Sequence, residues 1–100
     1  MSAKIEVNDG VVLLSGELNM QTVPGVYSQL PEVLAQGDST NLVFDLKAVT
    51  RSDSAGLGLL VECMQQAENR QAAVSFRNIP GQMWDIARMT GLDEVLPVAS

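Results

Sequence analysis

The sequence contains no histidine and only one cysteine. Without histidine the chain has no imidazole general base, no Ser-His-Asp triad and no Cys/His zinc site. A single cysteine excludes a disulfide within the chain. These absences argue against most hydrolytic chemistry, and we expect a protein without a metal ion or other cofactor.

Positive charge is also scarce, because 6 Lys and Arg residues face 12 Asp and Glu residues, for a net charge of -6. This charge opposes binding to phosphate backbones and to anionic lipid surfaces. No apolar run approaches the roughly 18 residues that a membrane-spanning helix needs, and the first residues (MSAKIE) lack the apolar stretch of a signal peptide. We therefore expect a cytoplasmic protein that binds no nucleic acid and does not insert directly into a membrane.

Apolar residues make up 46% of the 100 residues, which is enough for one hydrophobic core. No internal repeat and no linker rich in Ser, Pro or Gly divides the chain. The sequence therefore predicts a single domain over residues 1–100.

Three segments have the pattern of β-strands. Two β-prone runs, residues 4–8 and 11–15, flank Asp9-Gly10, and such a pair is a strong signal for a β-hairpin. Residues 41–46 form an almost wholly apolar run, typical of a parallel strand covered on both faces. Residues 74–77 predict a further strand.

Three segments have the pattern of helices. The first follows Thr22 and Pro24 and extends to Gly37, with Pro31 expected to kink or restart it. Its apolar residues recur at helical spacing: Val26, Leu30, Val33 and Leu34. The second covers about residues 54–69, and the third is opened by Pro80 and ended by Gly91. Strands that alternate with helices predict a mixed sheet with helices packed on it.

The turn that starts the second helix carries the most information. Asp53 is a favourable N-cap, and Ser54 then occupies the first helical position. We expect outward-facing amides at Ala55, Gly56 and Leu57, where the helix dipole favours an anion. A phosphate on Ser54 would carry about -1.5 to -2 charge beside the Asp53 carboxylate, and would prevent a partner from docking there.

A purely structural role remains open for the same turn, with Asp53 capping the helix and Gly56 and Gly58 allowing close packing. A phosphate cradle for a free nucleotide is the weaker interpretation, because the sequence has no G-x-x-x-x-G-K-[ST] motif and stops one glycine short of G-x-G-x-x-G. Asp45 and Asp53 could form an acid/base pair. We expect instead that Asp45 ends a strand and that the protein is not an enzyme.

The second helix has more apolar surface than a helix that only covers a sheet. Its expected inward stripe is Leu57, Leu60, Val61 and Met64. Leu59 and Cys63 widen the apolar arc to roughly 200°, where about 100° is enough. The surplus either packs on a neighbouring helix or contacts a partner, and if exposed it adjoins Ser54.

The third helix is expected to turn Met83, Ile86, Ala87 and Thr90 inward. Trp84 and Arg88 then lie at its edge. Trp and Arg are frequent hot spots of interfaces, although a lone Trp is also commonly part of the structure. Cys63 is most simply a small buried hydrophobic residue.

Asp45-Leu46, a short loop and residues 53–60 (DSAGLGLL) resemble the signature of STAS domains, and residues 14–18 (LSGEL) and 91–97 (GLDEVLP) support the resemblance. The resemblance implies an α/β, STAS-like (SpoIIAA-like) fold, with a mixed β-sheet of four to five strands and helices packed mainly on one face. It also implies that the protein has no enzymatic activity.

In the anti-sigma factor antagonists of this family, a serine at this position is phosphorylated by a partner serine kinase. The resemblance assigns that role to Ser54, with Asp53 beside it. Ala55 stands where many antagonists have a second Ser or Thr.

Within the family the flanks look most similar to the small cytoplasmic STAS subunit of the Mla phospholipid ABC transporter, which maintains outer-membrane lipid asymmetry. The first hypothesis is therefore an accessory subunit that docks on the ATPase subunit and so lies at the inner membrane through a protein complex. Those subunits usually carry Thr where this chain has Ser54. The alternative is an anti-sigma factor antagonist that binds a serine kinase and is regulated by phosphorylation. The expected contact residues are Asp53, Ser54, Ala55, Gly56, Leu57, Leu59, Cys63 and Trp84.

Overall fold

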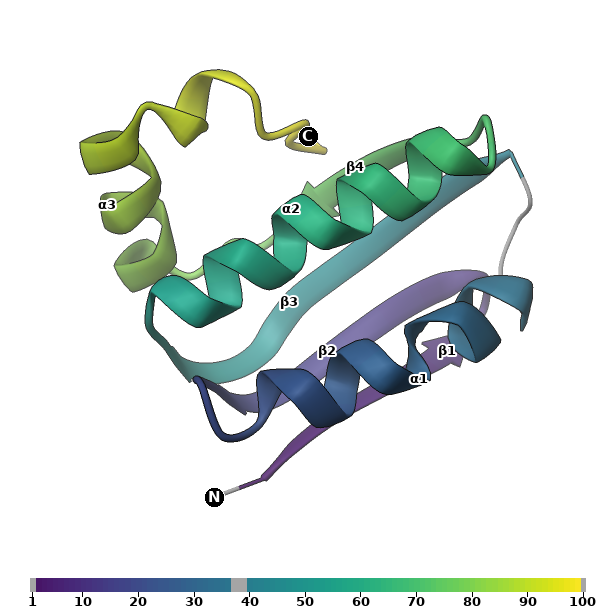
Figure 1. The fold of residues 1–100 in the computed structure, drawn as a ribbon, viewed down its shortest axis with the longest axis horizontal. Coiled ribbons are helices and arrows are strands. Elements are labelled where there is room, and N and C mark those ends of the chain that lie inside the picture. Colours follow the sequence, from purple (N-terminus) through teal and green to yellow (C-terminus); the bar gives the residue numbers. More distant parts are fainter. Residues whose placement is uncertain (1, 37–39, 100) are drawn as a thin grey trace.

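The computed structural model describes residues 2–36 and 40–99. Within these residues the chain alternates strands and helices (Figure 1). The elements in order are β1 (Ala3–Asn8), β2 (Val11–Leu18), α1 (Val23–Gln36), β3 (Asn41–Ser52), α2 (Ser54–Asn69), β4 (Ala73–Arg77), α3 (Gly81–Thr90) and a short 3-10 helix (Leu92–Glu94).

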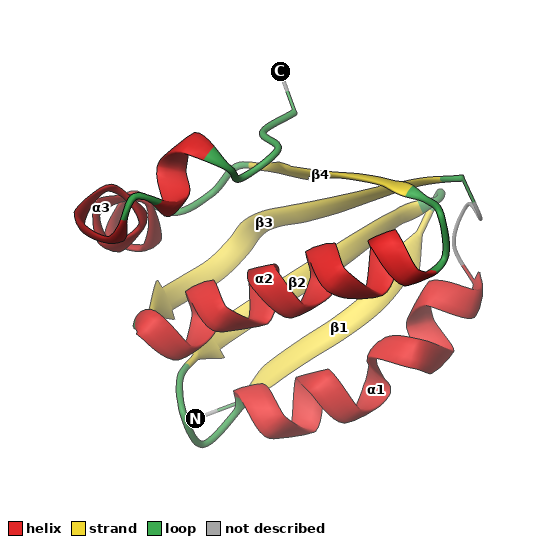
Figure 2. Ribbon diagram, turned by 45° about the horizontal axis from the view of Figure 1, so that its top comes forward, coloured by secondary structure: helices red, strands yellow, loops and turns green. Residues whose placement is uncertain are grey.

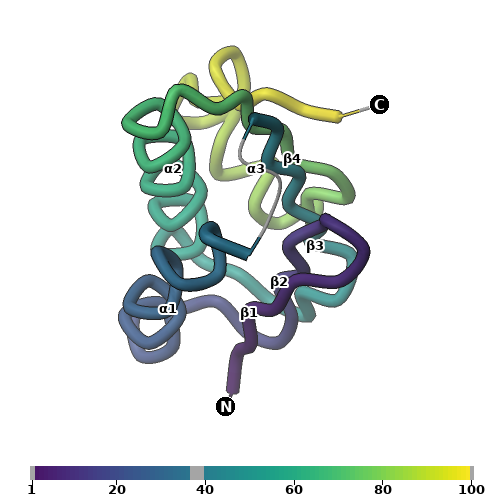
Figure 3. The backbone as a smooth tube through the Cα atoms, turned by 90° about the vertical axis from the view of Figure 1, so that its right-hand side faces the viewer, coloured from purple at the N-terminus to yellow at the C-terminus, as the bar shows by residue number. Residues whose placement is uncertain are grey.

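The strands form one mixed sheet in the order β1-β2-β3-β4. β1 and β2 are antiparallel, whereas β2 and β3, and β3 and β4, are parallel. Helices α1 and α2 lie on one face of the sheet, and within the described residues the opposite face carries no helix (Figure 2). The same two layers are visible from the side in Figure 3. The expected α/β fold with a mixed sheet and helices mainly on one face is confirmed.

The C-terminal residues extend the sheet by a short pairing beside β4. Phe76 donates its N–H to the carbonyl of Pro97 at 2.8 Å and accepts the N–H of Ala99 at 2.8 Å. This forms an isolated parallel bridge between Phe76 and Val98. The outer edge of β4 is thereby partly covered.

The predicted hairpin is confirmed, and its second strand is longer than expected. Asp9 and Gly10 make the two-residue turn with φ values of 54° and 80°. Both residues are left-handed, which Gly adopts without strain and Asp tolerates. β2 continues to Leu18 because its last residues pair with β3.

Helix α1 buries the predicted apolar side chains Val26, Leu30, Val33 and Leu34. The helix is continuous through Pro31, which is exposed, so of the two expected effects, a kink or a restart, the restart is wrong. Packing of the apolar face onto the sheet compensates for the one hydrogen bond that proline removes. The expected end of the helix, Gly37, lies outside the described residues.

β3 is twice as long as the apolar run that predicted it. The expected loop after Leu46 is instead strand, and Asp45 lies within β3, not at its end. In the sequence, the second half of β3 resembles a loop because Lys47, Thr50 and Arg51 are polar. In the structure these side chains face solvent. Parallel pairing with β2 holds them in the sheet, with register shifts between Leu13 and Ser15 and between Gly16 and Glu17.

Helix α2 has the predicted bounds but a different inward face. Val61 and Met64, expected inside, are only half-buried. The buried residues are Gly56, Leu57, Leu59, Leu60, Cys63 and Ala67. The helix contacts α1 and α3 as well as the sheet, so neighbouring helices cover the apolar surface that a helix on an isolated sheet would expose.

Helix α3 buries Met83 and Ala87, whereas Ile86 is half-buried and Thr90 is exposed, in contrast to the expected inward position of Thr90. Gly91 ends the helix in the left-handed conformation, with φ 78°, as predicted. Among the described residues, no helix combines the length and the apolar character that crossing a membrane requires.

Candidate functional site

Ser54 lies exposed at the first residue of α2. The Asp53 side chain caps the helix, because its Oδ1 accepts the N–H of Ala55 at 2.8 Å. The Asp53 carbonyl accepts the N–H of Gly56 at 3.1 Å. The expected cap is confirmed, but the amides of Ala55 and Gly56, expected to be free, are already hydrogen-bonded.

The residues before Ser54 are fixed by hydrogen bonds to β2 and α3 and by one bond within the turn. Asp53 donates its N–H to the carbonyl of Leu18 at 3.2 Å, at the end of β2. Ser52 donates its N–H to Oε1 of Gln82, in α3, at 3.0 Å. Ser52 is 3% exposed, and its hydroxyl donates to the Asp53 carbonyl at 3.1 Å. Of the two serines at this turn, only Ser54 therefore presents its hydroxyl to solvent.

Gly56 allows the start of α2 to lie directly on the sheet. A β-carbon at this position would overlap the Ser52 hydroxyl oxygen and would lie 3.1 Å from Cβ of Leu18 and 3.2 Å from Cε of Met83. Gly58 differs, since a β-carbon there would meet no atom within 4 Å. The two glycines of the turn thus have different roles, close packing at Gly56 and an open surface at Gly58.

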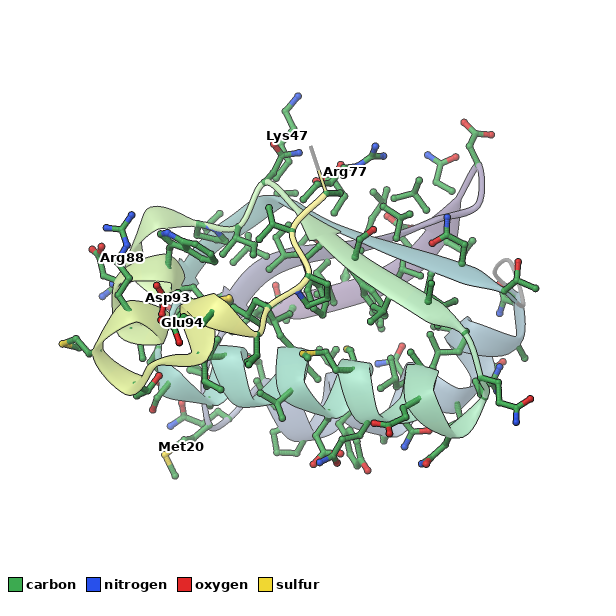
Figure 4. All side chains as sticks on the ribbon, turned by 90° about the horizontal axis from the view of Figure 1, so that it is seen from above. Met20, Lys47, Arg77, Arg88, Asp93 and Glu94 are labelled. Carbon is green, nitrogen blue, oxygen red and sulfur yellow. The ribbon has the colours of Figure 1, made fainter. Side chains whose placement is uncertain are left out.

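A mostly apolar groove of about 480 Å³ runs beside Ser54, between α1 and α2. We call it the α1–α2 groove; it is lined by Val23, Pro24, Tyr27, Ala55, Gly58, Leu59 and Glu62. Tyr27 is 42% exposed, and Met20, in the loop before α1, is 79% exposed and points away from the fold in Figure 4. A large exposed side chain such as Tyr27 in an apolar groove is typical of a protein-binding surface.

A second, polar hollow of about 260 Å³ lies on the other side of the turn. It is lined by Glu17, Leu18, Asn19, Gln21, Arg51, Ser52, Asp53 and Gln82. Arg51 and Glu17 form an ion pair across it, with Nε and Oε1 3.6 Å apart. Asp53 lines this hollow and Ala55 lines the α1–α2 groove, so Ser54 sits on the ridge between a polar and an apolar depression.

The structure corrects the expected contact face. Leu57, Leu59 and Cys63 are buried in the core, and Cys63 has no exposed surface, so Leu57 and Cys63 present no side chain to a partner. Packing among α1, α2 and the sheet explains this, and Leu59 contributes only to the floor of the α1–α2 groove. Gly56 is also buried.

Trp84 is half-buried against the core and lines neither depression. Its ring lies below the Arg88 guanidinium, whose carbon is 6.0 Å from the ring centroid. This is the distance of a weak cation–π contact. Trp84 is therefore placed by the structure as part of α3 packing and not beside Ser54.

The residues that sequence reasoning missed come from α1 and the loop before it. Val23 continues the buried stripe of α1 and is half-buried, whereas Pro24 and Tyr27 lie beside that stripe and Met20 lies in the preceding loop. The apolar character of Tyr27 beside the stripe, and of Met20 before the helix, is the signal that could have found them.

Asp45 and Asp53 do not form an acid/base pair, because the seven residues of extended β3 between them place them roughly 25 Å apart. Asp45 lies on the face of the sheet without helices, where its carboxylate pairs with Arg77 at 3.5 Å and accepts from Nδ2 of Asn78 at 3.0 Å. Figure 4 shows Arg77 and Lys47 on this side, opposite α2. Partial burial raises the pKa of Asp45, but hydrogen bonds from Asn78 and the Lys47 N–H, with the charges of Arg77 and Lys47, outweigh burial and lower it below 3.8.

Comparison with known proteins agrees with this architecture. A family model described as "Mlab, STAS domain" matches residues 1–97. The anti-sigma-B factor antagonist of Bacillus subtilis (strain 168) is 24% identical over 100 residues, covering 100% of this chain and 90% of the relative.

Two solved structures share the fold. A crystal structure of an anti-sigma factor antagonist from Mycobacterium paratuberculosis is 28% identical, with a TM-score of 0.73, and the match covers 96% of this chain and 82% of the other. The anti-sigma factor antagonist SpoIIAA in its unphosphorylated form is 20% identical, with a TM-score of 0.71, and the match covers 98% and 88%. The expected SpoIIAA-like fold is confirmed.

Proposed function

Because the chain belongs to the STAS domain family, we propose that it is an anti-sigma factor antagonist. It binds a serine kinase of the anti-sigma type while Ser54 is unmodified, and it is released when that kinase phosphorylates Ser54. The observation that carries the proposal is the exposed Ser54 hydroxyl on a fixed turn, beside an apolar groove. The relatives' names as anti-sigma factor antagonists support it.

The partner docks on the ridge of Ser54 and in the α1–α2 groove. Tyr27 supplies exposed apolar area on the α1 side of the groove, and Glu62 supplies a carboxylate on the α2 side. Aromatic side chains at the centre of an interface commonly contribute most of its affinity. Gly58 leaves the groove open because it carries no side chain.

Phosphorylation changes this surface through one group. The Ser54 hydroxyl oxygen attacks the γ-phosphorus of ATP, the bond from that phosphorus to the β–γ bridging oxygen breaks, ADP leaves, and the hydroxyl proton passes to a base on the kinase. The product places about -1.5 to -2 charge next to the Asp53 carboxylate. The Ala55 and Gly56 amides are already bonded to Asp53. The phosphate therefore remains hydrated, and burying it under a partner would require a large desolvation free energy.

The test is incubation with Mg²⁺, ATP and the candidate kinase, followed by intact-mass measurement. The wild type gains one phosphate and Ser54→Ala gains none. Thr50→Ala, which removes an exposed hydroxyl in β3 four residues before Ser54, is the matched control and still gains one. Modification of Ser54→Ala to the same extent as the wild type contradicts the assignment.

A second candidate function is favoured by one observation, the "Mlab" description of the matched family. The chain would then be an accessory subunit of the Mla phospholipid ABC transporter that docks on its ATPase through the same turn. Copurification with an ATPase and a permease, in a complex that ATP does not dissociate, supports this candidate. Release of the partner upon phosphate transfer to Ser54 supports the antagonist.

A further inference from the structure

The two edge strands of the sheet differ in whether their outer sides are paired. The outer edge of β4 is bridged by residues 97–99, which pair with Phe76. β1 is the other outermost strand (Figure 1), and among the described residues no strand pairs with its outer side. Exposed strand edges are templates for pairing with another chain.

The register of the hairpin shows which backbone groups of β1 face outward. The carbonyl of Ser2 accepts the N–H of Glu17 at 3.1 Å, so Ser2 turns its backbone toward β2. In an antiparallel ladder this direction alternates along the strand. Lys4 and Glu6 therefore also bond toward β2, whereas Ala3, Ile5 and Val7 direct their N–H and C=O groups away from it.

β1 has few of the features that usually protect an edge strand. Its six residues contain no proline and pair with β2 without the register shifts found between β2 and β3. The one protective feature is the charge of Lys4, and Glu6 follows on the same face. Both side chains are exposed on the side of the sheet away from the helices.

We propose that β1 pairs in antiparallel fashion with β1 of a second copy of this chain, around a two-fold axis at Ile5. Ile5 then exchanges two hydrogen bonds with Ile5 of the partner subunit, and Ala3 pairs with Val7 of the partner subunit. The two sheets become one continuous sheet, with an isologous interface of the kind that closes at a dimer.

Charge selects this register over its neighbours. When Ile5 faces its own copy, Lys4 lies directly opposite Glu6 of the partner subunit, and symmetry repeats the pair. Opposite charges stabilise such cross-strand pairs and like charges destabilise them. A register shifted by two residues in one direction places Lys4 opposite Lys4 of the partner subunit. The same shift in the other direction places Glu6 opposite Glu6 of the partner subunit. A shift of one residue breaks the match of outward backbone groups.

The helix side of β1 suits the same register. Ile5 is buried, and Ala3 and Val7 are partly buried against the core. When Ile5 pairs with Ile5 of the partner subunit and Ala3 pairs with Val7 of the partner subunit, the apolar layer beneath the helices continues across the interface. The interface thus places apolar side chains on one face and two ion pairs on the other.

The test uses charge reversal and sedimentation velocity over a concentration series. Wild type self-associates to a dimer. Lys4→Glu and Glu6→Lys each place like charges opposite one another and weaken self-association by an order of magnitude, about tenfold or more. An equimolar mixture of the two variants restores the dimer, because Glu at position 4 then faces Lys at position 6. The double variant Lys4→Glu/Glu6→Lys also dimerises.

Arg70→Glu and Glu68→Lys are matched controls, because they change the net charge equally at exposed positions near the end of α2. Both leave the dimer unchanged. Far-UV circular dichroism and thermal unfolding confirm that each variant is folded. A monomeric wild type, undiminished dimers of the single variants, or a mixture of them that stays monomeric would each overturn the proposal. The inference is independent of the partner that Ser54 contacts.

Discussion

Gly56 and the Ser52 hydroxyl occupy adjoining space, so that a β-carbon on Gly56 would overlap the Ser52 oxygen. The Ser52 hydroxyl has little freedom to move, because it is buried and hydrogen-bonded to the Asp53 carbonyl. We therefore expect Gly56→Ala to lower the free energy of unfolding by about 1–3 kcal/mol. Urea unfolding followed by circular dichroism measures the change.

Gly58→Ala is the matched control, since the new β-carbon meets nothing within 4 Å. Alanine in a helix interior is favoured over glycine by roughly 0.5–1 kcal/mol, so this variant is more stable than the wild type. In Ser52→Ala/Gly56→Ala the overlapping oxygen is absent. The double variant therefore loses less free energy of unfolding than the sum of the losses in Ser52→Ala and Gly56→Ala. Equal destabilisation by both glycine substitutions would contradict the packing account.

The Cys63 thiol is expected to be unreactive in the folded chain. Burial, and to a smaller extent the charge of Glu62, raise the pKa of Cys63 to about 12. Thiolate is the reactive form, so a disulfide reagent such as DTNB labels the native protein only as fast as the fold opens. In urea, DTNB labels the one thiol of the same chain rapidly. Equally rapid labelling without denaturant would show that Cys63 is accessible.

Acid is expected to weaken the fold partly through Asp45. Its pKa in the folded state lies below 3.8 because its hydrogen bonds and the charge of Arg77 outweigh partial burial. A depressed folded pKa contributes stability above the unfolded value, and this contribution is lost as the pH falls through the folded pKa. When urea unfolding is measured over an acidic pH series, the free energy of unfolding therefore falls less steeply with decreasing pH for Asp45→Asn than for wild type. Identical slopes would mean that Asp45 does not contribute.

Tyr27 is expected to matter for partner binding and not for the phosphorylation chemistry itself. Tyr27→Ala removes the aromatic side chain from the α1–α2 groove and weakens the kinase complex by about tenfold or more. Glu68→Ala, at an exposed position on α2 that does not line the groove, is the control and leaves affinity unchanged. Calorimetric titration measures both. Equal affinities for the two variants would remove the groove from the docking surface.

The elements that the sequence predicts well are those whose signals are local. Helix α2 begins after Asp53 because a side-chain oxygen caps it, and the hairpin turns at Asp9-Gly10 because both residues adopt positive φ. The second half of β3 is not predicted because Lys47, Thr50 and Arg51 break the apolar run, and only pairing with β2 reveals a strand.

The candidate site was predictable only in part, for a related reason. Asp53 and Ser54 are identified by their own sequence signature. The burial of Leu59 and Cys63 depends on α1, which a helical wheel of α2 alone does not contain. Tyr27 belongs to the groove for the same reason, since it is brought to α2 by the fold from far along the chain.

The most direct measurement follows the complex between this chain and the candidate kinase by size-exclusion chromatography before and after addition of Mg²⁺ and ATP. The account predicts that wild type leaves the complex as its Ser54 acquires one phosphate, whereas Ser54→Ala stays bound in ATP. A wild-type complex that persists with Ser54 phosphorylated, or one that ATP dissociates equally well for Ser54→Ala, would contradict it.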